Sequence, residues 1–336
     1  MLILLPTLLA LFSVAISATI AIRARASARS LVSRITVPSS DAPQARAIVA
    51  STRRRMILAV VLGALAAVGC LMLPLDHLGS ALVFAPAVGA VIALLVIAIS
   101  PTPYRPFRVG LRFAELTPRG AATFGPRWGF VVPLIATALL VSLLITTGMS
   151  AVSDDGGLPR AIYVAVPHGS NEGTPYPGWY YGVPILAASA VLVAVTLVAL
   201  HRVAAAPRIG PADLPHLDGA VRAALTRFVM LVATAVILLY LGGVSLFAAE
   251  TLRTTSQWAQ IKPSILDSLH ATGGGVIPAN AVIHGVVQPF YTVGAVGVLF
   301  GIILIGIAIL VALLAVTNVG IRSSAVTASE AQKVHA

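Results

Sequence analysis

Seven stretches of the chain contain no Asp, Glu, Lys, Arg or His, and each is long enough to cross a lipid bilayer. A helix rises about 1.5 Å per residue, so about 20 apolar residues cross the roughly 30 Å hydrocarbon core of a membrane. Only 10% of the residues are charged, whereas a soluble domain carries about 25%. The sequence therefore predicts an all-α, polytopic membrane helix bundle of about seven spans: 2–22, 56–75, 81–99, 129–149, 182–200, 228–249 and 292–319.

Basic residues predict the orientation of these spans. Lys and Arg in short loops concentrate on the cytoplasmic side of a membrane protein. Of the 22 such residues, the outer segments contain only Arg160, Arg253 and Lys262. We therefore expect the N-terminus outside, the C-terminus inside, and a location in the bacterial cytoplasmic membrane. The remaining basic residues lie in four segments on the other side: 23–55, 100–128, 201–227 and 320–336.

The first apolar stretch could instead be a cleaved signal peptide. Such a peptide needs a positively charged start and an apolar core of only about 7 to 15 residues. Residues 1–22 have neither feature, and Arg23, Arg25 and Arg29 follow them. We expect an uncleaved anchor whose basic flank lies in the cytoplasm.

The predicted organisation is a single bundle over residues 1–319 with a cytoplasmic tail at 320–336. Its two long outer loops, 150–181 and 250–291, could fold into a small cap. Residues 160–166 have β-propensity, residues 154–157 and 175–178 read as turns, and 254–269 could form a short helix broken by Pro263.

Two inner segments are candidate surface helices. Residues 118–128 begin with proline after a threonine that can cap the helix. Residues 218–227 would direct Val221, Leu225 and Phe228 towards lipid and Arg222 and Arg227 towards headgroups.

The predicted spans contain no ionisable side chain except Cys70 and the normally neutral phenol of Tyr240. Ionisable groups within spans usually mark proton relays or ion pathways, so their absence argues against a proton-coupled pump. The sequence contains no HExxH, Walker A, GxSxG or CxxC motif, and its one cysteine excludes an internal disulfide. We expect no cofactor, no metal site and no catalytic residue. The only candidates for metal binding or acid/base chemistry lie in the outer loops, and solvated loop positions explain them better. They are His168, His270 and His284, with the carboxylates Asp154, Asp155, Glu172, Glu250 and Asp267.

Aromatic residues at the outer ends of the spans are candidates for a recognition surface. They are Trp179, Tyr180, Tyr181 and Trp258, together with His168 in the same loop region. Interfacial anchoring of the helices is the alternative explanation for the aromatic rings. Gly297 and Gly301 form a small-xxx-small pair, which permits close helix packing within the chain or, as a less favoured alternative, against a partner.

The net charge of +11 does not indicate nucleic-acid binding, because the basic residues lie between apolar runs and form no stripe on a soluble domain. The expected partners are the lipid bilayer and another protein or a second copy of the chain.

Two stretches beside the spans resemble known sequences. Residues 174–184, TPYPGWYYGVP, and residues 114–120, AELTPRG, resemble those of uncharacterised multi-span membrane proteins of GC-rich actinobacteria. The resemblance implies the layout of loops and spans. It implies no activity and no functional residues.

Three functions are compatible with these features. The favoured one is a non-enzymatic membrane component that acts with partners through its outer loops. The alternatives are a transporter or permease subunit driven by a separate ATPase, and an envelope enzyme acting at the outer face.

Overall fold

The computed structural model consists mainly of long apolar helices. It describes residues 42–72, 80–99, 121–125, 127–166, 169–207, 215–261, 283–284, 295–303, 305–307 and 310–311. The predicted span 2–22, the tail 320–336, His168 and His270 lie outside the described residues. Four described helical stretches are long and apolar enough to cross a membrane: Ala47–Met72, Gly129–Ser150, Trp179–Ala205 and Asp218–Trp258.

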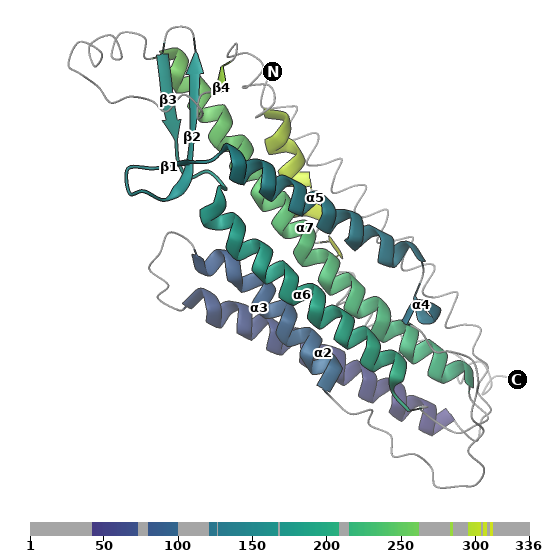
Figure 1. Ribbon diagram of the computed structural model, residues 1–336. Coiled ribbons are helices and arrows are strands. Elements are labelled where there is room, and N and C mark those ends of the chain that lie inside the picture. The colour runs from purple at the N-terminus through teal and green to yellow at the C-terminus, as the bar shows by residue number, and fades with distance from the viewer. Residues whose placement is uncertain are drawn as a thin grey trace, which may run out of the picture. The chain divides into compact units, whose positions relative to one another are not determined.

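Six helices follow one another along the described chain, with three strands between the fourth and the fifth of them and a fourth strand after the last (Figure 1). A further helical segment, Ala295–Ile307, follows near the end and corresponds to part of the predicted span 292–319. The helices are α2 (Ala42–Met72), α3 (Ser80–Ile99), α4 (Ala121–Phe124), α5 (Arg127–Ser150), α6 (Trp179–Ala205) and α7 (Pro215–Ile261).

The chain divides into two compact units, each described here by itself. The sheet unit comprises the described residues of Ile135–Ala188 and Ile237–Ala308. The hairpin unit comprises the described residues of Ala15–Leu134, Ser189–Val236 and Ile309–Ala336.

In the hairpin unit, α2 and α3 pack together where each carries a glycine. A Cβ atom on Gly63 would lie 2.6 Å from the Gly89 carbonyl oxygen, and one on Gly89 would lie 2.8 Å from the Gly63 carbonyl oxygen. Only hydrogen at both positions permits this approach. Large apolar side chains elsewhere on α2 are exposed, as expected for a surface in contact with hydrocarbon; they include Leu58, Val61, Leu65 and Val68.

Helix α7 corrects the predicted boundaries of the sixth span. It runs without a break from Pro215 to Ile261, so it includes the predicted span 228–249, the end of the inner loop and the start of the outer loop. Pro215 suits the first turn of a helix, and the next proline in the chain is Pro263. Hydropathy shows where apolar residues stop, but a helix continues through polar turns until its backbone is interrupted.

Residues 218–227 are helical as predicted, but the prediction that this helix lies on the membrane surface is wrong. Val221, Leu225 and Phe228 are buried, with exposed fractions of 4% or less, and they do not face lipid. Arg222 is also buried, at 1% exposure, so it does not reach towards headgroups. The segment is the first part of α7 and packs inside the hairpin unit.

The buried Arg222 guanidinium occupies the C-terminal end of α6. Its Nη1 donates to the carbonyl oxygens of Val203 and Ala204, at 2.8 and 2.9 Å. Its Nη2 donates to those of Ala206 and Pro207, at 2.8 and 3.1 Å. The last carbonyls of a helix have no partner within it, and a planar group with five N–H donors suits such a cluster.

Two further contacts complete the surroundings of Arg222. Its Nε donates to Asp218 Oδ2 at 2.8 Å, one helical turn earlier on α7. Its guanidinium carbon lies 5.6 Å from the centre of the Phe124 ring on α4, which is within cation–π range. One side chain therefore joins α4, α6 and α7.

The predicted inner helix 118–128 is interrupted in the structure. Helix α4 ends at Phe124 and α5 begins at Arg127. The intervening Gly125 and Pro126 explain the break, because proline disfavours helical geometry in the residue before it.

The predicted all-α fold is interrupted in the sheet unit, which contains four short strands. The strands are β1 (Val152–Ser153), β2 (Pro159–Val166), β3 (Gly169–Gly173) and β4 (Ile283–His284). Strands β1 and β3 pair antiparallel with β2, and β4 pairs with β2 in parallel. The predicted strand 160–166 is confirmed, and the turn at 154–157 contains Gly157 with a φ of 76°, a conformation that favours glycine.

Replacing Arg222 with alanine should destabilise the protein strongly. The change removes the donor of four carbonyls and one partner of the Asp218 carboxylate, and breaking a buried pair in this way costs about 3 to 5 kcal/mol. The stability of Arg222→Lys should lie between that of Arg222→Ala and that of the wild type, because a lysine ammonium lacks the planar set of N–H donors that a guanidinium has. Thermal unfolding in detergent measures both variants. The matched control is Arg202→Ala, at an exposed position near the same end of α6; an equal loss of stability in the control would contradict the assigned role.

Candidate functional site

The sheet is fixed to the last turns of α7. Thr251 Oγ1 lies 2.6 Å from the Pro175 carbonyl oxygen, and Asn171 Nδ2 donates to the Thr255 carbonyl oxygen at 3.5 Å. A Cβ atom on Gly173 would lie 1.8 Å from Thr255 Oγ1, so strand β3 approaches the helix as closely as glycine allows. The sheet is therefore held against a helix that continues into the apolar part of the unit.

Tyr176 connects the same loop to the end of α5. Its side chain is buried, and its hydroxyl lies 2.8 Å from Ser150 Oγ. Burial raises the pKa of the Tyr176 phenol, and the hydrogen bond between this phenol and the Ser150 hydroxyl opposes that shift. The phenol thus remains a neutral hydroxyl at the rim of an apolar region.

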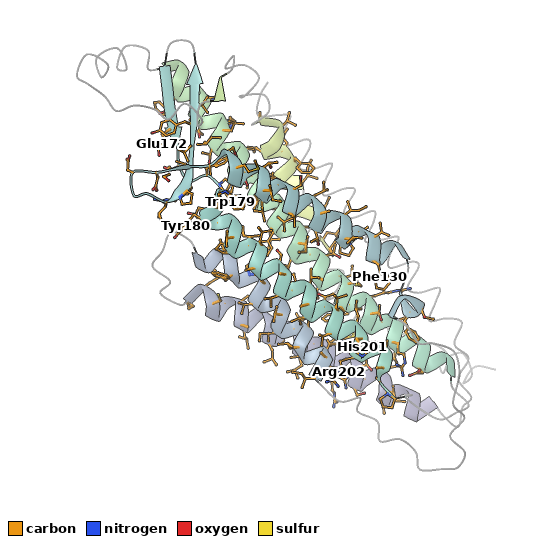
Figure 2. The ribbon with its side chains drawn as sticks, viewed as in Figure 1. Phe130, Glu172, Trp179, Tyr180, His201 and Arg202 are labelled. Atoms are coloured by element: carbon orange, nitrogen blue, oxygen red, sulfur yellow. The ribbon has the colours of Figure 1, made fainter. Side chains whose placement is uncertain are left out.

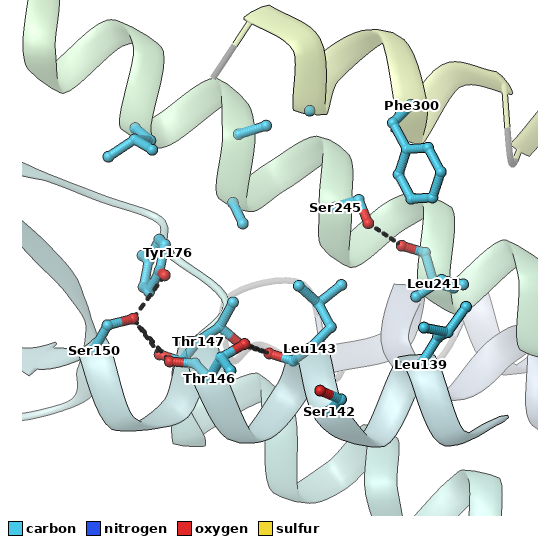
Figure 3. A pocket seen from close by; sticks show the side chains of 14 residues that line it. Leu139, Ser142, Leu143, Thr146, Thr147, Ser150, Tyr176, Leu241, Ser245 and Phe300 are labelled. Atoms are coloured by element: carbon cyan, nitrogen blue, oxygen red, sulfur yellow. Dashed lines mark hydrogen bonds between the residues drawn. The ribbon is translucent and has the colours of Figure 1, made fainter. Parts of the chain in front are cut away.

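An open groove of about 530 Å³ lies beside this tyrosine, between α5, α7 and the segment Ala295–Ile307 (Figure 3). All of its lining residues belong to the sheet unit. Pockets for small molecules typically enclose about 300 to 1,000 Å³, and their walls are mostly apolar with a few polar groups. The large apolar side chains of the wall are Leu139, Leu143, Leu241, Leu252 and Phe300, and its hydroxyls are those of Ser142, Thr146, Thr147, Ser150, Tyr176 and Ser245.

At least three of the six hydroxyls that line the groove donate their protons to backbone carbonyls. Thr146 and Thr147 donate to the Leu143 carbonyl oxygen at 2.8 and 2.9 Å, and Ser245 donates to the Leu241 carbonyl oxygen at 2.7 Å. Hydroxyls on apolar helices usually bond in this way to the preceding turn. The groove is therefore less polar than its residue types suggest.

Charged side chains of the sheet region are paired with one another. Arg160 forms a salt bridge with Asp154, and the Tyr163 hydroxyl donates to Glu172 Oε2 at 3.0 Å. Asp154 Oδ1 also accepts the backbone N–H groups of Gly156 and Leu158, at 3.0 and 2.9 Å. The Leu158 N–H, followed by the Arg160 guanidinium and the Gly156 N–H, holds the pKa of Asp154 below its usual value against the opposing effect of burial. Within the described stretches, no three His, Cys, Asp or Glu side chains come together as metal ligands would.

The predicted recognition residues occupy different environments. Trp179 opens α6 and packs on α5, where a Cβ atom on Gly148 would lie 2.6 Å from Trp179 Cε2. Tyr180 and Tyr181 stack edge to face with ring centres 4.8 Å apart, and the Tyr181 hydroxyl bonds with Arg160. Figure 2 shows Trp179, Tyr180 and Glu172 at the sheet end of this unit. Trp258 lies near the end of α7 with 53% of its side chain exposed.

The two predicted packing glycines face α7 within the same chain. A Cβ atom on Gly297 would lie 2.7 Å from the Ala249 Cβ atom, and one on Gly301 would lie 2.8 Å from the Gly242 carbonyl oxygen. The segment Ala295–Ile307 is thereby placed beside α7, where Gly297 and Phe300 line the groove.

Sequence reasoning missed Tyr176, Ser150 and the groove. A signal did exist on α5, because Ser142, Thr146 and Ser150 repeat every four residues and share one helix face. The α7 residues across the groove lie about 100 positions away in the chain, so no local pattern indicates which segment that face contacts.

Comparison with known proteins gives no match: no protein family, no curated protein and no solved structure is similar to this chain. The geometry of the sheet and groove is therefore the basis for interpreting the site.

Replacing Asp154 with asparagine should remove an acid-sensitive contribution to stability. The Asp154 pKa is lowered in the folded protein, so its contribution is present above the ordinary aspartate pKa of about 3.9 and is lost as the pH falls through the lowered value. The melting temperature of the wild type should fall more steeply than that of Asp154→Asn between neutral and acidic pH. Asp155→Asn is the control, since Asp155 is exposed in the same turn. An identical pH profile for wild type and Asp154→Asn would contradict the role given to Asp154.

Proposed function

We propose that this chain is a non-enzymatic component of the bacterial cytoplasmic membrane that acts with a protein partner through an extracytoplasmic sheet. The proposed topology has seven spans, an outside N-terminus and an inside C-terminus. The sheet, formed from the loops 150–178 and 262–291, would lie outside.

The parallel pairing of β2 with β4 is the observation that carries this proposal. Val164 pairs with Ile283 and Ala165 with His284, so the two loops predicted to lie outside meet in one sheet. Loops on opposite faces of a membrane could not do so. The pairing supports a common side for both loops, and the basic residues of the other segments support assigning that side to the exterior.

An ordered recognition surface is the role that this sheet best fits. Four of its ionisable groups are engaged in Asp154–Arg160 and Tyr163–Glu172 pairs, an arrangement that stabilises the shape of the sheet. Exposed aromatic side chains are enriched where proteins bind one another. Trp258 and the partly exposed Trp179 are the residues of this kind beside the sheet.

The chain's two lysines permit a direct test of partner binding. Lys262 and Lys333 are the only lysines, and under the proposed topology only Lys262 lies outside. A membrane-impermeant amine crosslinker applied to intact cells should join Lys262 to one discrete partner. Trp258→Ala should abolish the adduct, because the tryptophan lies four residues from the lysine. Phe247→Ala is the control, as another exposed aromatic residue on α7.

Two results would count against the proposal. An adduct that is unaffected by Trp258→Ala would reject the assigned surface. A nucleotide-hydrolysing subunit that copurifies with the chain, together with no outer adduct, would favour the permease alternative. Loss of the adduct in Lys262→Arg would confirm that it forms through that lysine.

A further inference from the structure

Small side chains form most of the wall of the groove beside Tyr176. Eight of its 14 lining residues are Gly, Ala, Ser or Thr. They include Ser142 on α5, Ala248 on α7 and Gly297 in the segment Ala295–Ile307. In a membrane, such residues are enriched where helices pack together, because they let two backbones approach closely. The wall therefore has the composition of a surface that packs against a helix.

One hydroxyl of this wall has no partner within it. The Ser142 side chain is exposed on α5, and it forms no hydrogen bond with any other residue of the wall (Figure 3). Ser142 belongs to the charge-free stretch 129–149, so under the proposed membrane placement it faces the bilayer interior. A hydroxyl without a hydrogen bond is destabilising in an apolar medium. A hydrocarbon chain offers this hydroxyl no partner, whereas a helix that carries hydroxyls does.

One predicted span, residues 2–22, lies wholly outside the described residues, and each of the other six is described at least in part. The segment 2–22 carries no charged side chain. As a helix it would be about 32 Å long, which is enough to cross the hydrocarbon core. The proposed bundle therefore contains one further helix, and the groove offers a packing surface for it.

The segment 2–22 has a face that matches the wall. Thr7, Ala10, Ser13 and Ser17 follow one another at intervals of three or four residues, so a helix brings them to one side. This side combines small size with hydroxyl groups, as the groove wall does. Two such surfaces can approach closely and form hydrogen bonds with each other.

The depth of this face in the membrane also agrees with the groove. With each predicted span centred in the membrane, Thr7 lies about 7.5 Å from the centre at 1.5 Å per residue. Ser142 and Thr146 lie about 4.5 and 10.5 Å from the centre on the same scale. In the proposed topology all three residues lie on the outer side. Thr7 thus falls between two exposed hydroxyls of α5.

We propose that residues 2–22 form a helix that packs in the groove, with Thr7 opposite Ser142 and Thr146. The inference rests on the membrane placement and the topology proposed above. It gives the N-terminal segment a defined role, because this helix covers the wall formed by α5, α7 and Ala295–Ile307. The occupant of the groove is then a part of the chain itself.

A disulfide between two engineered cysteines tests this packing in the full chain. In a Cys70→Ala background, Thr7→Cys is combined with Ser142→Cys, and a protease site is inserted in the inner segment 23–41. Membranes are treated with a mild oxidant and then with the protease. The N-terminal fragment should remain joined to the rest of the chain until a reductant is added, because the two cysteines face each other.

The matched control combines Leu9→Cys with Ser142→Cys. Leu9 lies at the depth of Ser142, about 4.5 Å from the centre, but about 160° around the helix from Thr7. Its N-terminal fragment should separate without a reductant. A second control combines Thr7→Cys with Val68→Cys, since Val68 is 53% exposed on α2, and this pair should also separate.

A photoreactive amino acid at position 142 gives an independent readout should a cysteine pair prove unstable in thermal unfolding. Its attachment to residues 2–22 of the same chain would support the inference. Attachment to phospholipid alone, or to a second copy of the chain, would overturn it. Mixing two copies that carry different tags distinguishes attachment within a chain from attachment between chains.

Two results of the disulfide experiment would also overturn the inference. They are equal joining of the fragments in the Thr7 and Leu9 variants, and joining through Val68 in place of Ser142. The Lys262 adduct is measured separately. Absence of the disulfide therefore leaves the partner proposal standing, and absence of the adduct leaves the packing of residues 2–22 standing.

Discussion

Backbone carbonyls at a helix end have no partner within the helix, and where they are buried their donors must come from elsewhere in the protein. Arg222 shows how this chain meets the requirement. Its guanidinium supplies donors to four carbonyls at the end of α6 while its Nε contacts Asp218 on α7. A charged side chain becomes compatible with a buried position because every N–H group has an acceptor. The burial of Arg222 is thus explained by the carbonyls at the end of α6 to which it donates.

The same constraint shapes the sheet unit. Thr251 reaches the Pro175 carbonyl, and Asn171 reaches the end of α7, so polar groups of the loop are satisfied where it meets the helices. Glycine at position 173 allows the strand to come that close. Fixing the sheet in this way also fixes Tyr176 against Ser150. The rim of the groove therefore depends on the anchoring of the sheet.

The sequence predicts some of these features well and others poorly, for physical reasons. Apolar runs identify membrane-compatible helices, and the alternating β-formers of residues 160–166 identify β2, because both signals are local. The continuous length of α7 is not visible in hydropathy, since Arg222 reads as a loop or headgroup residue until its partners are known. Arg222 binds carbonyls that lie about 15 to 19 positions away in the chain. The groove is formed by three segments that no local sequence pattern connects. Trp179 reads as an interfacial anchor, and its packing on Gly148 emerges only from the fold.

The central claim is that this chain crosses a membrane with its sheet outside, and cysteine labelling tests it most directly. In a Cys70→Ala background, Ser153→Cys places a single thiol on an exposed position of β1, and Ser323→Cys places one in the tail. A membrane-impermeant maleimide applied to intact spheroplasts should label position 153 and should label position 323 only after permeabilisation. Labelling of position 323 in intact spheroplasts, with position 153 protected until permeabilisation, would contradict the account.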